Sequence, residues 1–287
     1  MTLDNGIGVI GLGTMGAPMA ARLAAGGHRV FAWNRSPVAA PAGVELVGSP
    51  ADLADHADTV LVMVTGPEAV RQVLFDDHGW AANASAGHIV VQSSTIGPDE
   101  MRAVGAELAS RGVRALDAPV SGSSEPARKG ELVVLGGGDS GDFAELAPLF
   151  DAIARKVVVF GPVGSGSAVK LAVNAVLIST VAAGAEALNW LLGREPDLDI
   201  EQVAGVLERV SPILAGRAQK IAGEPAPSGF PLAHVTKDLR LIEAGSAKHT
   251  VLSSVLAVCA DAAASGFGET DLAALGTYLR SSRRGRL

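Results

Sequence analysis

The feature that most constrains the fold lies at the start of the chain, where a short apolar run meets a cluster of glycines. Residues 6–10 predict a buried strand, and Gly11-Leu12-Gly13-Thr14-Met15-Gly16 follows at once, before a helical pattern that ends at Gly26-Gly27. This spacing of glycines between strand and helix is typical of dinucleotide-binding domains. The first glycine permits a tight turn, the second admits a pyrophosphate, and the third allows close packing. The sequence therefore predicts a helix N-terminus that faces phosphates.

The rest of the first half repeats the alternation of strand and helix. Further strands are predicted at residues 30–33, 60–64, 89–92, 115–117, 132–136 and 157–160, and the clearest helices between them at 68–74 and 98–111. Short apolar strands that alternate with helices indicate a mainly parallel sheet. We therefore predict an α/β Rossmann domain over residues 1–162.

After Gly161-Pro162 the pattern changes to helices alone. Residues 165–192 predict one long helix that is apolar on nearly every face, and further helices are predicted at 201–210, 237–245, 251–266 and 271–280. We expect an all-α domain over residues 163–287, joined to the first domain through the long helix. A helix without a polar face needs cover on all sides, which predicts a homo-oligomer.

Composition and charge exclude several classes of protein. The net charge of −7 argues against nucleic-acid binding, which needs clustered basic residues. Cys259 is the single cysteine, so no intramolecular disulfide forms and a cytoplasmic location is expected; we interpret it as a buried, inert thiol. The uncharged stretch 171–185 is shorter than the roughly 18 apolar residues of a membrane span, so we predict a core helix and no membrane contact. No metal site is predicted.

The residues after the second strand predict which dinucleotide binds. NAD enzymes usually carry Asp or Glu about 20 residues beyond the glycines, whereas this chain has Asn34-Arg35-Ser36. Arg35 can pair with the 2′-phosphate of NADP, and its neighbours can donate hydrogen bonds, so NADP(H) is preferred in this interpretation. The alternative is a solvated loop arginine. Met63-Val64-Thr65 and Thr95 end two later strands and are predicted to meet the cofactor, although Thr95 also suits ordinary turn chemistry.

Lys170 is the candidate catalytic residue. It lies about one turn into an otherwise apolar helix, with Asn174 four residues further on the same face. A lysine in such surroundings either extends its ammonium to solvent or has its pKa lowered from about 10.4, which suits a proton donor. Spacing alone leaves both readings open.

Several ordered motifs resemble those of the β-hydroxyacid dehydrogenase family. They are the glycine-rich segment, Ser94-Thr95-Ile96, Asp117-Ala118-Pro119-Val120-Ser121-Gly122, Gly164-Ser165-Gly166 with Lys170 and Asn174, Phe230-Pro231-Leu232 and Lys237-Asp238-Leu239. The segment Ser121-Gly122-Ser123 with Pro126-Ala127 and Gly130 looks most like the glyoxylate and succinic semialdehyde reductase branch. The resemblance covers nearly the whole chain.

The resemblance implies a role for each of these positions. Ser121, Gly122 and Ser123 would hold the substrate's carboxylate, Lys170 would be the acid/base, and Asn174 would orient the substrate. Lys237 would approach the cofactor, with Phe230 and Asp238 lining the cleft. The implied enzyme is a dimer or tetramer that interconverts a small aldehyde or keto acid and the hydroxy acid, with hydride from NADPH.

One residue counts against this interpretation, and two alternative functions are weighed beside it. Glu125 stands where this branch often carries Lys, which opposes an anionic substrate unless Glu125 pairs with Arg128 or Lys129. An imine reductase shares the architecture, but enzymes resembling that group generally lack the lysine at position 170. A catalytically silent NADP-binding module would also be expected to have lost it.

Overall fold

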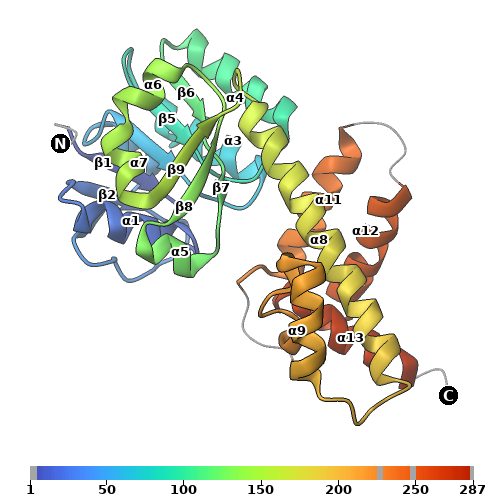
Figure 1. The fold of residues 1–287 in the computed structure, drawn as a ribbon. Helices are drawn as coiled ribbons and strands as arrows, with labels where there is room; N and C mark the ends of the chain where they lie inside the picture. The colour runs from blue at the N-terminus through green and yellow to red at the C-terminus, as the bar shows by residue number, and fades with distance from the viewer. Residues whose placement is uncertain (1–4, 225–228, 246–249, 285–287) are drawn as a thin grey trace. The chain divides into compact units, whose positions relative to one another are not determined.

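The computed structural model of the chain describes residues 5–224, 229–245 and 250–284, in two compact units (Figure 1). The first unit ends at Lys170 and the second begins at Leu171. The first contains parallel strands and helices, and the second is helical, with helix α8 (Ser165–Leu192) joining the two. The predicted fold class is therefore confirmed.

Six parallel strands form the main sheet of the first unit, in the order β3-β2-β1-β4-β5-β6. Their bounds are β1 Ile7–Ile10, β2 Val30–Trp33, β3 Val44–Leu46, β4 Thr59–Val62, β5 Ile89–Gln92 and β6 Arg114–Asp117. Neighbouring residues of β1 belong to different cores, Val9 to one and Ile10 to the other, because both faces of the sheet are covered. The strand order reverses at β1, so the carboxyl ends of β1 and β4 form the switch point where such sheets bind ligands.

The helices of this unit connect the strands and cover the sheet. Their bounds are α1 Gly16–Ala25, α2 Pro50–Ala54, α3 Pro67–Phe75, α4 Pro98–Ser110, α5 Ser124–Lys129, α6 Ser140–Glu145 and α7 Ala147–Ile153. Local chemistry sets where they begin. At α2 the Ser49 hydroxyl accepts from the Asp52 N–H at 3.2 Å, and the Asp52 carboxylate accepts from the Ser49 N–H at 2.9 Å. This reciprocal pair satisfies amides that the first turn leaves unbonded.

Three strands form a second sheet that was not predicted, because the strands expected at 132–136 and 157–160 were assigned to the one main sheet. The second sheet consists of β7 (Val120–Ser121), β8 (Leu132–Gly136) and β9 (Ala154–Val159), with β7 antiparallel and β9 parallel to β8. The strand predicted at 157–160 is the second part of β9, and it pairs with β8 in this sheet. Strands β3 and β7 were not predicted, because three and two residues are too few to show a pattern.

The second unit packs its helices around the buried side of α8. The helices after it are α9 Ile200–Val210, α10 Ala218–Ala222, α11 Leu232–Ala244, α12 Thr250–Ala262 and α13 Leu275–Arg284. Ile178, Val181, Ala185 and Leu188 of α8 lie in their common core. Helix α11 begins five residues before the predicted start, directly after Pro231, whose fixed φ suits the residue before a helix.

Helix α8 is not buried on all sides, which corrects the expectation of a core helix over 171–185. The exposed fractions of Val173, Val176 and Trp190 are 40%, 59% and 56%. Two helical stretches of the described chain, 165–192 and 250–267, are long and apolar enough to cross a membrane by length and composition alone. Core helices of soluble proteins meet the same criterion, and the opposite side of α8 is packed into such a core.

Candidate active site

The glycine-rich loop between β1 and α1 leaves room for a ligand at one glycine only. A Cβ at Gly11 would lie 2.2 Å from the Met63 carbonyl oxygen, and Gly11 has a φ of +97°; a Cβ at Gly16 would lie 1.9 Å from the Gly11 oxygen. The packing of the backbone therefore requires glycine at both positions, with or without a ligand. A Cβ at Gly13 would meet nothing within 4 Å. The open space over Gly13 fits the passage of a dinucleotide's pyrophosphate against the backbone.

The first turn of α1 is also suited to an anion. Met15 precedes the helix and provides no side-chain cap, and no acidic residue lies in the first turn. The first amides of a helix have no partner within it, and the dipole adds partial positive charge there. This end of α1 can therefore bind phosphate oxygens through backbone N–H groups.

At the end of β2, Asn34 and Arg35 have different roles. The Asn34 Oδ1 accepts from the Leu12 N–H at 2.8 Å, and its Nδ2 donates to the Ser36 carbonyl at 2.8 Å. Asn34 therefore ties the glycine-rich loop to the end of β2, a positioning role that the prediction of a cofactor donor did not include. Arg35 and Ser36 are exposed, and the guanidinium makes no ion pair among the described residues. Arg35 is thus available to an anionic ligand.

The ends of β4 and β5 are fastened to each other. The Val64 N–H donates to the Ser94 hydroxyl at 2.9 Å, and the buried Gln92 side chain bonds both the N–H and the carbonyl of Ser94. Met63, Val64 and Thr95 are half-buried and Thr65 is exposed. Met63, Val64 and Thr65 follow β4, which is next to β1, and Thr95 follows β5, the next strand along, so all four lie at the carboxyl edge of the sheet, as predicted. The bracing by Gln92 and Ser94 was not predicted.

The loop predicted to bind the substrate's carboxylate joins β7 to α5. Gly122 has a φ of +134°, and a Cβ there would lie 2.7 Å from Leu132 Cδ2, so the turn needs glycine. Ser121 is half-buried, and Gly122 and Ser123 are exposed. Ser123 precedes α5 without using its hydroxyl as a cap. The hydroxyls and amides of this loop are therefore suited to a small polar ligand.

Glu125 is paired within α5, as the helical spacing predicted. Its carboxylate lies 3.2 Å from Lys129 Nζ and 3.4 Å from Arg128 Nη1. The hydrogen bond and charge of Lys129, followed by Arg128, lower the pKa of Glu125. The pairing leaves α5 with no net acidic charge beside the loop, so the objection to an anionic substrate is weakened.

Lys170 is half-buried in the second turn of α8, close to a set of hydrogen bonds that fix the helix start. The carboxylate of Asp117, at the end of β6, accepts from the N–H groups of Gly164 and Ser167, each at 2.9 Å, and from the Ser167 hydroxyl at 2.7 Å. Burial raises the pKa of Asp117, and the bonds from Ser167 and Gly164 partly oppose that rise. Lys170 thus stands on a helix start that is anchored to the sheet.

In the second unit, Asn174, Asp238 and the half-buried Lys237 form one cluster. The Asn174 Nδ2 donates to the Asp238 Oδ2 at 2.6 Å, and Lys237 Nζ lies 2.7 Å from the Asp238 Oδ1. Asn174 and Asp238 are 3% and 2% exposed. One amide hydrogen of Asn174 is thus committed to Asp238, and the amide oxygen is turned away from that carboxylate. Residues 64 positions apart are joined, which no local pattern could predict.

Phe230 is held by a residue that the sequence did not single out. The carboxylate of Asp271 accepts from the N–H of Gly229 at 3.0 Å and of Phe230 at 3.2 Å. The phenyl group of Phe230 is half-buried and packs against the helical core. Asp271 also caps the turn at Leu272–Ala274, so one carboxylate sets both segments.

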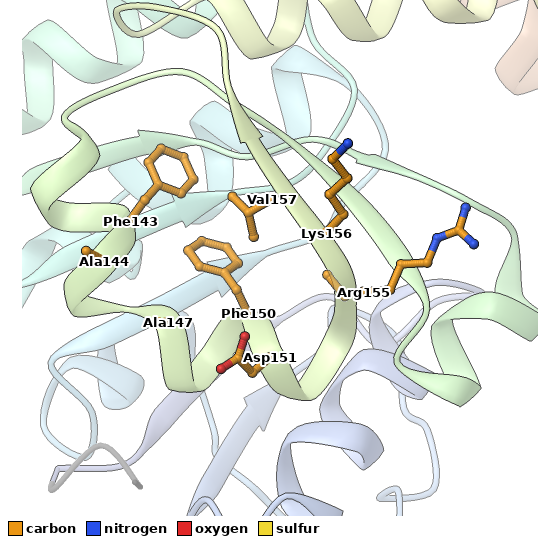
Figure 2. Close-up of a pocket in the computed structure, with 9 residues that line it drawn as sticks. Phe143, Ala144, Ala147, Phe150, Asp151, Arg155, Lys156 and Val157 are labelled. Carbon is orange, nitrogen blue, oxygen red and sulfur yellow. The ribbon is translucent and has the colours of Figure 1, made fainter.

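Two other features of the molecule lie apart from these residues. A pocket of about 320 Å³ lies between α7 and β9, with Phe143, Phe150 and Val157 grouped together while Arg155 and Lys156 extend away from them (Figure 2). None of the predicted site residues lines it. Cys259 is fully buried, and burial raises the pKa of its thiol to about 12, so the predicted inert thiol is supported.

Comparison with known proteins places the chain in a family. Residues 6–161 match the NAD binding domain of 6-phosphogluconate dehydrogenase, and residues 164–278 match the NAD-binding region of NADP-dependent 3-hydroxyisobutyrate dehydrogenase. An uncharacterized oxidoreductase of Synechocystis is 38% identical, covering 82% of this chain and 84% of its own.

Two further relatives match over nearly the full length. Glyoxylate/succinic semialdehyde reductase 1 of Arabidopsis thaliana is 29% identical, covering 96% of this chain and 99% of its own. The structure of Mycobacterium tuberculosis 3-hydroxyisobutyrate dehydrogenase with L-serine is 30% identical, with a TM-score of 0.81 over 96% of this chain and 98% of that one.

The fold, the site and these matches define an NAD(P)-dependent oxidoreductase. The chain belongs to the β-hydroxyacid dehydrogenase family, of the 3-hydroxyisobutyrate dehydrogenase type. The resemblance found in the sequence motifs is confirmed. Small hydroxy acids are typical substrates of this family.

Proposed function

We propose that the protein is an NADPH-dependent reductase of a small aldehyde or keto acid, with succinic semialdehyde ahead of glyoxylate. The observation that carries this proposal is the anchoring of two predicted site elements to one strand end. Asp117 ends β6 four residues before Ser121, and its carboxylate holds the helix turn that precedes Lys170. The end of β6 thus holds both the loop that would bind a carboxylate and the helix turn that precedes the proton donor. Such an arrangement suits a substrate whose carbonyl group lies near a carboxylate.

The cofactor preference rests on charge at the end of β2. Gly13 and the first turn of α1 would hold the pyrophosphate, and exposed Arg35 would hold the 2′-phosphate. The segment 34–36 contains no carboxylate, and Glu45 lies on β3 beside Phe31, away from the strand end. Such a site attracts the additional phosphate of NADP(H). When bound, the nicotinamide supplies the hydride.

The chain's own residues would supply the proton and the orientation. Lys170 donates a proton from Nζ to the carbonyl oxygen as that oxygen gains negative charge, and its ammonium stabilises the charge. Ser121 and Gly122 bind the substrate's carboxylate through the hydroxyl and backbone N–H, with Ser123 beside them. Asn174 orients the substrate, with its amide held by Asp238.

Substrate preference tests this proposal. The ratio kcat/KM is measured with NADPH for succinic semialdehyde, for glyoxylate and for butanal, which has the same chain length as succinic semialdehyde but no carboxylate. We expect succinic semialdehyde to be preferred over butanal by roughly tenfold or more, since hydrogen bonds to a charged group contribute about 1.5–3 kcal/mol. Equal or better reduction of butanal would refute carboxylate binding by Ser121 and Gly122.

The same panel separates the alternatives. A cyclic imine as an additional substrate tests the imine-reductase alternative, in which the imine would exceed every carbonyl compound. Failure to oxidise NADPH with any of these compounds, together with tight NADPH binding, would favour the silent nucleotide-binding module.

A further inference from the structure

Asp117 forms hydrogen bonds through both its main chain and its side chain, close to the predicted catalytic lysine. Its main chain pairs with Gly137, the N–H donating at 2.9 Å and the carbonyl accepting at 2.7 Å. Its side chain is 0% exposed and accepts from Gly164 and Ser167. Asp117 is therefore bonded through its backbone to the residue that follows β8, and through its carboxylate to the start of α8.

This arrangement differs from an ordinary helix cap. A helix is usually capped by the side chain of the residue that precedes it, whereas the carboxylate here comes from 47 and 50 positions earlier in the sequence. Surface helices of the same chain do use local caps: Asp139 accepts from the Gly141 N–H at 2.7 Å at the start of α6. A distant, buried carboxylate fixes the position of the helix relative to the sheet as well as satisfying its amides.

The glycines of the segment 164–166 show how tightly the helix start is seated. A Cβ at Gly166 would lie 2.2 Å from the Leu135 carbonyl oxygen and 3.0 Å from that of Asp117. A Cβ at Gly164, whose φ is +95°, would lie 2.9 Å from the Pro98 carbonyl oxygen. The start of α8 therefore lies against β8 and β6 at Gly166, and the residue before it, Gly164, lies against the start of α4, so a side chain at either glycine would collide with backbone.

We propose that Asp117 is a positioning residue for Lys170, setting the place of its backbone against the loop at Ser121 through the hydrogen bonds to Gly164 and Ser167. This inference rests on the proposed role of Lys170 as the proton donor. Ser167 lies one helical turn before Lys170, so a displaced first turn displaces the lysine with it. Misplacement of a catalytic group by about 1 Å can reduce a rate by about a hundredfold.

A double-mutant cycle tests the proposal. Asp117→Asn keeps the shape but puts an amide NH₂ among N–H and O–H donors. We expect a loss in kcat of roughly tenfold or more, with the Kd for NADPH unchanged. In the Lys170→Ala background, the same substitution should change kcat less than about twofold, because the group that Asp117 positions is gone.

Two further variants make the test decisive. Ser167→Ala removes only the hydrogen bond from the Ser167 hydroxyl to Asp117, at 2.7 Å. It replaces Asp117→Asn in the cycle if that variant does not fold. We expect a smaller loss of kcat, and no loss in the Lys170→Ala background. Asp139→Asn is the matched control, a carboxylate cap on α6, and should leave kcat unchanged.

The outcomes distinguish this inference from the proposed function. If Lys170→Ala retains wild-type kcat, the role of Lys170 itself is wrong. If Lys170→Ala is impaired and Asp117→Asn lowers kcat equally in both backgrounds, the proposed function stands and the positioning role of Asp117 is overturned.

Discussion

Arg35 shows how one exposed side chain distinguishes two cofactors that differ by a phosphate. It stands at the end of β2 without a carboxylate neighbour in its segment, whereas Asn34 beside it is already bonded to Leu12 and Ser36. The guanidinium is therefore the group in this segment that can respond to the 2′-phosphate.

Replacing Arg35 by Ala tests this role. Charge-assisted hydrogen bonds contribute about 1.5–3 kcal/mol, so NADPH should bind about tenfold to a hundredfold more weakly while NADH binding changes little. The measurement is the Kd of each cofactor by titration of the wild type and the variant. Equal use of NADPH and NADH by the wild type would contradict the assignment.

Individual site residues could be named from sequence motifs, but their contacts could not. Arg35 stands out because it lies where NAD enzymes usually carry an acidic residue, and Lys170 because it lies in an otherwise apolar helix. The hydrogen bonds from the Gly164 N–H to Asp117 and from Asn174 to Asp238 join positions 47 and 64 residues apart. Such pairings follow from the way the chain folds back on itself, and no local pattern carries them.

At the scale of elements, the glycine-rich loop contains glycines that the fold requires and one that leaves space for a ligand. Gly11 and Gly16 are closely contacted by the chain, while the space at Gly13 is open. The glycine spacing predicted a tight turn at Gly11, an approach to the pyrophosphate at Gly13 and close packing at Gly16, and the space around each glycine agrees with those roles.

Substitution of Gly13 should therefore affect NADPH binding, whereas substitution of Gly16 should affect thermal stability. Gly13→Ala should keep a Tm close to that of the wild type and weaken NADPH binding, by roughly fivefold to a hundredfold if the added methyl group costs 1–3 kcal/mol against the ligand. Gly16→Ala should lower Tm, because its Cβ would lie 1.9 Å from the Gly11 oxygen. Thermal unfolding and NADPH titration of both variants provide the check. A large loss of Tm in Gly13→Ala would count against the open site.

Element prediction succeeded where patterns were long and failed where they were short. The long helix was predicted with the bounds 165–192 that the structure has, because 28 residues give a clear signal. Strand β3 has three residues, of which Glu45 and Leu46 are exposed, so its sequence resembles a loop. The start of α11 was missed because Leu232 follows a proline in a segment without clear periodicity.

At the scale of the whole molecule, an exposed apolar stripe on α8 favours self-association. Val173, Val176, Ala183, Ala187 and Trp190 are all exposed. Their spacing is that of helix positions that pack against a partner helix. We propose that this α8 stripe is covered by a second copy of the chain, which would supply the cover that the sequence predicted the helix to need.

A charge placed in the α8 stripe should separate the copies. Val176 is 59% exposed in the single chain, so Val176→Asp should be tolerated by the fold but should weaken the dimer by roughly tenfold or more, since an unpaired carboxylate would be buried. Leu46→Asp, at a residue 46% exposed on β3, is the control. Sedimentation at micromolar concentration reports the masses; a monomeric wild type would refute the proposal.

Lys170 is the residue that we propose as the proton donor in an NADPH-dependent reduction. The most direct test of this role is the kcat of Lys170→Ala with succinic semialdehyde, alongside the Kd for NADPH, with Lys156→Ala as the control at an exposed lysine of β9. General acid catalysis contributes about a hundredfold or more, so kcat should fall by at least roughly that factor while the Kd stays unchanged. Wild-type turnover by Lys170→Ala would show that Lys170 is not the proton donor.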